Sequence, residues 1–405
     1  MTRGVHPLIH DWNGESGGSG LSVMLDDETL RDGLQSPSVC MPTFEQKVEI
    51  LHQMEALGID TADIGLPGAG AHVAADVERL AKVIGQERLH IAANCAARTI
   101  AADIQPIADI VQRTGVPIEC CAFIGSSPVR QFTEGWTLDF LRKTTEEAIG
   151  FAVKQGLTVM YVTEDTTRAD PDSLRALITT ALRAGASRLC VADTVGHATT
   201  HGAKAVVGFV KRLLDELGVD AGIDWHGHSD RGFGVASAIA ACEAGATRLH
   251  GAALGIGERS GNTPMDLLLV NLVMMGYIDR ALTTLPQYCD AVARACDVPI
   301  PKNYPVVGAD AFRTATGVHA AALVKAFRKN DRALMDAVYA AVPASLVGRE
   351  QEIEIGPMSG RSNVIYWLER RGLTATDEVV DRIFAAAKSS TRTLTSDQID
   401  KLVKS

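Results

Sequence analysis

Residues 157–196, LTVMYVTEDTTRADPDSLRALITTALRAGASRLCVADTVG, decide the fold. The stretch opens with a β-branched and apolar run at 157–164 and closes with another at 188–196. Between them, residues 172–184 carry Leu and Ile every three or four positions, which is typical of an amphipathic helix. Two strands joined by a helical crossover are expected to run parallel in one sheet. This stretch therefore predicts a strand–helix–strand unit.

The same unit recurs along most of the chain. Helical patterns such as those at 45–57 and 201–217 separate eight short apolar runs, at 22–27, 61–67, 89–96, 117–125, 157–164, 188–196, 222–229 and 247–255. Eight units in roughly 250 residues match a TIM (β/α)8 barrel. An open doubly wound sheet is the competing arrangement, but no G-x-G-x-x-G follows the first strand.

The pattern changes outside these units, and this predicts three regions in a chain of the α/β class. Residues 1–20 are Gly/Ser-rich near their end and predict a flexible N-terminal arm. Residues 21–285 predict the barrel, and residues 286–405 predict small, mainly helical C-terminal subdomains.

Composition limits the classes of function. The 405 residues include 39 Lys and Arg against 49 Asp and Glu, and this net charge of -10 disfavours a nucleic acid or anionic membrane as partner. The eight cysteines form no C-x-x-C pair and lie mostly in apolar runs, so reduced thiols are expected. With neither a signal peptide nor an apolar run of about 18 residues, the sequence predicts a cytoplasmic protein.

Polar residues gather where the predicted strands end, which is where TIM barrels hold their chemistry. His226 and His228 are two residues apart on a strand, so both rings face the same side and two imidazoles can share a metal. Asp32 and Asn262 follow the first and eighth strands, which are neighbours in a closed barrel. This nitrogen and oxygen set suits Zn²⁺, Mn²⁺, Co²⁺ or Mg²⁺. A hydrogen-bonded structural pair is the alternative for the two histidines.

Other strand-end residues have two interpretations each. Arg31 would face the site or form a surface ion pair. Glu164 and Asp165 would line the site or cap a following helix, since T-E-D-T-T-R suits a helix start. Cys120 and Cys121 lie within the fourth strand, and core thiols are the favoured interpretation there.

Several segments resemble the DRE-TIM metallolyase superfamily, and specifically its 2-isopropylmalate synthase and homocitrate synthase branch. DETLRDGLQ (27–35) resembles the first-strand motif of that family, WHGHSDRGFGVASAIAACEAGA (225–246) its His-x-His strand, and LGIGERSGNTPMD (254–266) its glycine-rich segment. The two small subdomains of the synthases are resembled by VVGADAFRTATGVHAAALVK (306–325) and VGREQEIEIGPMSGRS (347–362).

The resemblance implies a metal-dependent Claisen condensation of acetyl-CoA with a 2-oxo acid. It implies that the divalent metal binds to Asp32, His226, His228 and Asn262. It also implies that Arg31 stabilises an enolate or the carbonyl oxygen of the substrate.

Further roles follow from the same resemblance. Glu164 matches an acidic residue at the end of strand five, and Thr194 matches a substrate-binding threonine. His319 matches a subdomain histidine that helps to activate acetyl-CoA, and Tyr339 matches a subdomain tyrosine. Because these two side chains reach the other subunit in the synthases, an intertwined homodimer is implied. The loop holding Gly257 and Arg259 would lie beside the thioester and pantetheine arm.

Three departures from the family pattern bear on the substrate. Cys121 stands where the family has a fourth-strand histidine, and Asp63 stands where it has a second-strand glutamate. Pro357 and Met358 replace two basic residues of a subdomain motif. In the sequence up to Ser405, the leucine-sensing regulatory domain of long isopropylmalate synthases is not expected.

The substrate's side chain is expected against apolar or small residues at three strand ends: Leu66 and Pro67, Ile124 and Gly125, Tyr161 and Val162. A second substrate carboxylate would need a cation or several donors there. The sequence therefore favours an apolar 2-oxo acid over 2-oxoglutarate. The alternatives are homocitrate or citramalate synthesis, carbon–carbon cleavage as in 3-hydroxy-3-methylglutaryl-CoA lyase, and an inactive barrel that only binds a partner.

Overall fold

The computed structural model describes residues 6–13 and 22–404 and divides them into two compact units. The barrel unit comprises residues 22–280 and 287–299, and the C-terminal unit comprises residues 6–13, 281–286 and 300–404. Most of the predicted arm at 1–20 lies outside the described residues. The roles predicted for the regions 21–285 and 286–405 stay predictions.

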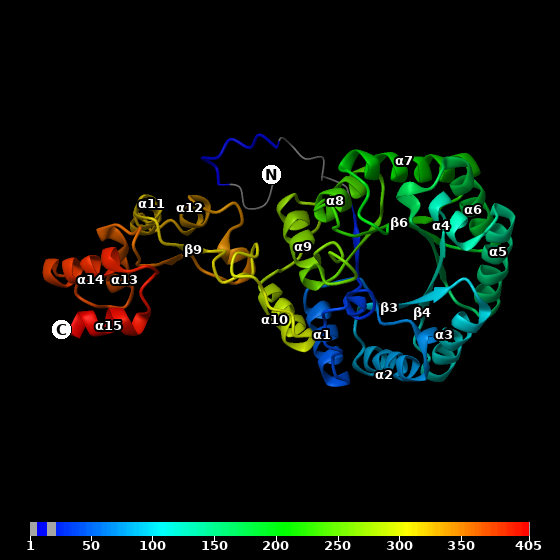
Figure 1. The fold of residues 1–405 in the computed structure, drawn as a ribbon, viewed down its shortest axis with the longest axis horizontal. Coiled ribbons are helices and arrows are strands. Elements are labelled where there is room, and N and C mark those ends of the chain that lie inside the picture. The colour runs from blue at the N-terminus through cyan, green and yellow to red at the C-terminus, as the bar shows by residue number, and fades with distance from the viewer. Residues whose placement is uncertain (1–5, 14–21, 405) are drawn as a thin grey trace. The chain divides into compact units, whose positions relative to one another are not determined.

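Eight parallel strands form a closed barrel in sequential order, which confirms the predicted fold (Figure 1). The strands are β1 (Met24–Asp27), β2 (Thr61–Asp63), β3 (Ala92–Arg98), β4 (Ile118–Gly125), β5 (Val159–Glu164), β6 (Arg188–Asp193), β7 (Gly222–Gly227) and β8 (Arg248–Gly251). The barrel closes where β1 pairs with β8, in a register that sets Asp26 opposite His250.

Helices surround the strands (Figure 1). They are α1 (Phe44–Ala56), α2 (Ala71–Glu87), α3 (Ala101–Thr114), α4 (Pro128–Glu134), α5 (Leu138–Lys154), α6 (Pro171–Ala184), α7 (Thr200–Leu217), α8 (Gly234–Ala244) and α9 (Met265–Met274). Helix α6 shows why these segments fold: Asp170 caps its first turn, and Gly185 ends it with a φ of 110°. Its buried face includes Leu174 and Leu177, and burying each such side chain stabilises the fold by roughly 1.5–3 kcal/mol.

The barrel interior contains buried charged side chains. Asp224 on β7 is fully buried and accepts hydrogen bonds from Arg188 at 2.8 Å and from Arg248 at 2.5 Å. Arg248 also donates to Glu119 on β4 at 2.6 Å. Burial would raise the pKa of Asp224, but Arg248 and His250 hold that pKa well below its usual range. Ion pairs thus take the place of apolar side chains in this part of the barrel.

Helix α10 (Leu285–Cys296) begins in the C-terminal unit and continues in the barrel unit. Its Tyr288 is buried and donates a hydrogen bond to Asp27 at the end of β1. Burial raises the pKa of Asp27 to about 7.

The C-terminal unit is mainly helical, as predicted. It contains α11 (Gly317–Arg328), α12 (Arg332–Ala337), α13 (Arg361–Arg370), α14 (Asp377–Ser389) and α15 (Ser396–Lys404), with a short parallel pair formed by β9 (Arg313–Thr314) and β10 (Glu352–Ile353). One apolar cluster joins α11 to α13 through Leu323 and Tyr366, and another joins α13 to α14 through Leu368 and Ile383. Across the described parts of both units, no helix is long and apolar enough to cross a bilayer.

Candidate active site

A cavity of about 220 Å³ opens at the carboxyl ends of the barrel strands. It brings together most of the residues that the sequence placed in a site: Arg31, Asp32, Asp63, Leu66, Cys121, Glu164, Thr194, His226, His228 and Arg259. Asn262 and Gly257 are not among the lining residues but lie close to each other, since a Cβ on Gly257 would meet the Asn262 side-chain nitrogen at 2.4 Å. His319 and Tyr339 belong to the C-terminal unit, with their ring centroids 4.1 Å apart.

Three of the four predicted metal ligands, Asp32, His226 and His228, lie close together. The Nε2 atoms of His226 and His228 lie 3.4 and 3.7 Å from Oδ2 of Asp32. All three residues are buried, yet Asp32 Oδ1 and His228 Nδ1 have no hydrogen-bond partner among the described residues. The Asn262 amide donates to the Ile256 carbonyl at 3.0 Å, which leaves its Oδ1 as a possible ligand. Unsatisfied buried atoms in a nitrogen and oxygen set fit a divalent ion.

Glu28 supports this group, and the sequence reasoning missed it. Its Oε1 lies 3.2 Å from Nδ1 of His226 and 2.9 Å from Nδ1 of His250. A carboxylate that accepts the Nδ1 proton leaves the Nε2 lone pair of His226 facing Asp32 and His228. Burial would lower the pKa of His226, but its hydrogen bonds with Asp32 and Glu28 raise that pKa.

His250 was also missed. It is 1% exposed, and its Nε2 lies 2.9 Å from Asp224 Oδ2, which links the site to the charged barrel interior. Glu28, His226 and His250 could themselves group around an ion, but their separations here are those of hydrogen bonds. The pairing of β1 with β8 was the signal that could have identified both residues, because it brings Glu28 and His250 to the same end of the barrel.

Arg31 is held by three carboxylates. Its Nε donates to Asp63 at 2.8 Å and its Nη1 to Asp32 at 3.1 Å, while Nη2 contacts Glu28. The alternative of a surface ion pair is therefore wrong, since the side chain is only 17% exposed. Burial raises the pKa of Asp63 well above its usual value despite the Arg31 charge. Burial would lower the pKa of Arg31, but Glu28 and its other acidic partners raise it.

Glu164 and Asp165, at the end of β5, have different surroundings. Glu164 lies at the mouth, with its Oε1 3.3 Å from Nε of Arg130, and burial raises its pKa. The capping interpretation is wrong for Asp165, whose carboxylate accepts from Ser127 and Arg168, while Asp170 caps α6. The backbone N–H of Asp165 donates to Thr194 Oγ1 at 2.8 Å, which fixes that hydroxyl beside the cavity.

Arg259, in the loop after β8, also lines the cavity. Its guanidinium donates to the Thr194 carbonyl at 2.5 Å and to Asp230 at 2.9 Å. Its backbone has a φ of 56°, in the left-handed region. The loop after β8 is thus tied to the ends of β6 and β7.

Sulfur atoms form the apolar wall. Cys121, Met160 and Cys190 make one buried cluster with Val162 against it. Cys120 and Cys121 are both buried thiols, as the core interpretation predicts, and Cys121 also lines the cavity. Burial raises the pKa of Cys121 well above its usual value, so its thiol is neutral.

The predicted side-chain pocket needs a correction. Leu66 and Val162 line the cavity, but Pro67, Ile124, Gly125 and Tyr161 do not. Side chains alternate along a strand, so neighbours in sequence cannot both face inward. The Tyr161 hydroxyl instead bonds to Thr145 on α5 at 3.0 Å, and Phe123 and Met160 take the inward positions.

Known proteins provide a comparison for this geometry. A family model described as HMGL-like matches residues 22–291. A "Probable 2-isopropylmalate synthase" of Methanopyrus kandleri is 30% identical over 370 residues, which cover 90% of this chain and 69% of that protein. "Homocitrate synthase AksA" of the same organism is 31% identical over 376 residues, covering 91% of this chain and 87% of that protein.

Solved structures share the fold. The HMG-CoA lyase of Bacillus subtilis superposes with a TM-score of 0.58 at 20% identity, covering 69% of this chain and 95% of the lyase chain. An HMG-CoA lyase from Pseudomonas aeruginosa gives a TM-score of 0.56 at 16% identity, covering 67% of this chain and 92% of the other.

Proposed function

The chain belongs to the HMGL-like, or DRE-TIM, family, and on that premise we propose that it condenses acetyl-CoA with a 2-oxo acid bearing an apolar side chain. The product would be a 2-substituted malate, as in a 2-isopropylmalate synthase. The observation that carries this proposal is one cavity that joins the Asp32, His226 and His228 group to a sulfur-lined wall.

The proposed ligands for a divalent ion are Asp32, His226, His228 and Asn262. Such an ion would act as a Lewis acid towards the keto and carboxylate oxygens of the 2-oxo acid. In the reaction, the acetyl methyl group loses a proton, its carbon bonds to the keto carbon, the keto oxygen gains a proton, and hydrolysis of the thioester releases CoA.

Arg31 is suited to stabilise charge on oxygen. Three carboxylates fix its guanidinium, so it needs no reorganisation when negative charge develops beside it. Glu164 is suited to hold or relay a proton, because it lines the cavity and burial raises its pKa above the ordinary value for a glutamate.

The base and the subunit arrangement remain part of the proposal. We retain His319 as the group that takes the methyl proton, with Tyr339 stacked on it. The two would reach the site of a partner in an intertwined homodimer, as the family resemblance implies. A cytoplasmic location also stays a prediction.

The substrate's side chain would pack on Cys121, Met160 and Cys190. The arginines that line this cavity are already paired, Arg31 with three carboxylates and Arg259 with Asp230. A second substrate carboxylate would therefore meet sulfur and aliphatic carbon, which solvate charge poorly. Because relatives named homocitrate synthase are 29–31% identical, condensation with 2-oxoglutarate is the second candidate.

The test mixes purified protein with acetyl-CoA, a panel of 2-oxo acids and Mg²⁺, Mn²⁺ or Zn²⁺, and follows free thiol release. We expect release with 2-oxoisovalerate or bulkier apolar acids and little with 2-oxoglutarate. A preference for 2-oxoglutarate would overturn the assignment of an apolar substrate. Cleavage of 3-hydroxy-3-methylglutaryl-CoA without any condensation would favour the lyase activity instead.

A further inference from the structure

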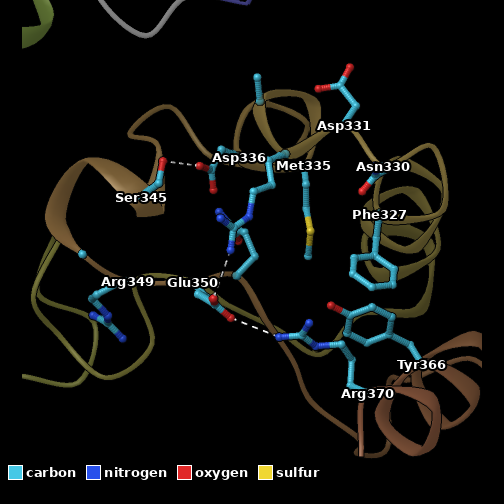
Figure 2. A pocket seen from close by; sticks show the side chains of 14 residues that line it. Phe327, Asn330, Asp331, Met335, Asp336, Ser345, Arg349, Glu350, Tyr366 and Arg370 are labelled. Atoms are coloured by element: carbon cyan, nitrogen blue, oxygen red, sulfur yellow. Dashed lines mark hydrogen bonds and ion pairs between the residues drawn. The ribbon is translucent and has the colours of Figure 1, made fainter. Parts of the chain in front are cut away.

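A second cavity, of about 530 Å³, lies wholly within the C-terminal unit (Figure 2). Its walls come from the end of α11, from α12, from the 3-10 turn Ala344–Val347, from residues 348–351 and from α13. No part of it depends on the barrel. It is large enough for a small organic ligand.

One side of this cavity is cationic. Arg332 and Arg370 share the carboxylate of Glu350, at 3.5 and 3.1 Å, so two guanidinium groups meet a single acidic partner. Figure 2 shows the contact between Glu350 and Arg370. Arg349 is turned elsewhere and donates to the carbonyls of Val306 and Gly308. One positive charge is therefore left over beside Glu350.

The acidic residues of the cavity limit how much negative charge a ligand can carry. Asp331 uses Oδ1 to cap α12 at the Leu334 N–H, 2.9 Å away, and Asp336 accepts from the Ser345 hydroxyl at 2.5 Å. Both carboxylates remain near the space and would repel a polyanion such as a nucleotide phosphate. The lining as a whole has three arginines against three acidic residues, so only the side formed by Arg332 and Arg370 favours an anion, and a ligand with a single negative charge can place that charge there.

An apolar wall adjoins Arg370, whose guanidinium carbon lies 5.6 Å from the centroid of the Phe327 ring, and this wall contains an unpaired hydroxyl. Phe327 and Tyr366 stack edge to face at 5.2 Å, with Met335 beside them (Figure 2). Tyr366 is only 5% exposed, and its hydroxyl points into the cavity and makes no hydrogen bond with a described residue. The side-chain nitrogen of Gln351, another lining residue, is also buried without a partner in this part of the chain. Both groups can donate to an acceptor oxygen.

From these contacts we propose that the C-terminal cavity binds a small monocarboxylic acid with an apolar body. The carboxylate lies between Arg332, Arg370 and the Tyr366 hydroxyl, and the body packs on Phe327 and Met335. The Tyr366 hydroxyl, which makes no hydrogen bond with a described residue, gains a charge-assisted bond to the carboxylate. This site is separate from the barrel cavity and does not require the proposed condensation.

Methionine resonances distinguish the two cavities, since Met335 lines this one and Met160 lines the barrel cavity. The full-length protein is labelled with ¹³C at the methionine methyl groups, and Met335→Leu and Met160→Leu assign the two signals. The probe is 4-methylpentanoate, compared with 4-methylpentanamide and 4-methylpentylamine. We expect the acid to shift the Met335 signal saturably, and the neutral amide and the amine to bind at least about tenfold more weakly.

Two variants test the assigned contacts. Tyr366→Phe keeps the packing and removes the hydroxyl, and Arg370→Met removes the charge, so each should weaken the Met335 titration severalfold to about tenfold. Arg328→Met is the matched control, because Arg328 pairs with Glu369 and does not line the cavity. Equal binding of acid and amide, a shift confined to Met160, or unchanged titration in Tyr366→Phe and Arg370→Met would overturn the proposal.

Discussion

Replacing Glu28 by glutamine tests whether this carboxylate orients the site. Glu28 accepts from Arg31 through one oxygen and faces the Nδ1 atoms of His226 and His250 with the other. Glutamine has nearly the same shape, but it offers one acceptor oxygen and one NH₂ group. Whichever way the amide turns, its NH₂ group then faces a donor. In one orientation that donor is Arg31, and the weaker amide oxygen replaces a carboxylate behind His226; in the other, His226 loses the acceptor that fixes its tautomer.

The expected magnitude follows from those contacts. Loss of a partner behind a metal-binding histidine typically weakens metal affinity about 10- to 100-fold, or about 1.4–2.7 kcal/mol. Breaking a buried ion pair costs about 3–5 kcal/mol of stability, and the lower value is expected because Arg31 keeps Asp32 and Asp63. Calorimetric titration of metal-stripped protein with Zn²⁺ or Mn²⁺ measures the first quantity, and denaturant unfolding measures the second.

Glu55→Gln provides the matched control. Glu55 also holds a histidine, since it accepts from Nδ1 of His90 at 2.9 Å, but it does not line the barrel cavity. Metal affinity should be unchanged in that variant. If Glu28→Gln binds metal as tightly as the unmodified protein, or if both variants weaken binding equally, the positioning role of Glu28 is refuted.

Three further predictions concern the same unit. Elemental analysis should find about one divalent ion per chain, and chelation should abolish turnover while leaving the circular dichroism of the barrel intact; two ions per chain would contradict the single site. Cys121→His should shift kcat/KM among 2-oxo acids toward smaller ones by tens-fold, about 1–3 kcal/mol, and steady-state kinetics with no such shift would refute the pocket argument. Asp27, with its pKa raised by burial to about 7, holds a proton in the native state at pH values where the unfolded chain has lost it. Its contribution to the free energy of unfolding therefore decreases as the pH rises from about 4 to about 7, by at most about 1.4 kcal/mol per pH unit. Asp27→Asn should flatten that slope in unfolding measurements, and parallel curves for the variant and the unmodified protein would count against it.

The number and order of the barrel strands could be predicted because each unit carries its own apolar run and helical stripe. Strand ends were less accurate for local reasons. The run at 61–67 stops as a strand at Asp63, because the chain turns at Gly65, which has a φ of 146°. The run at 89–96 starts late, because Leu89 still bonds back to Ile84 at the end of α2.

The site was predictable where a residue's place depends only on its own strand, as for His226 and His228. It was not predictable where the geometry depends on pairing between strands far apart in sequence. Glu28 and His250 meet only because β1 closes on β8 in one register. The inward or outward direction of Ile124 and Tyr161 needed the phase of the pleat, which an apolar run by itself does not reveal.

The charged interior below the site affects how this barrel could acquire new substrates. Asp224, Arg248 and His250 depend on one another for charge balance, so a single substitution among them leaves a buried ion without its partner. Cys121, Met160 and Cys190 carry no charge and contact the cavity mainly through sulfur and carbon. Selection or laboratory evolution can therefore change the side chains of this wall one residue at a time. The charged residues below it can change only when a second substitution restores the charge balance.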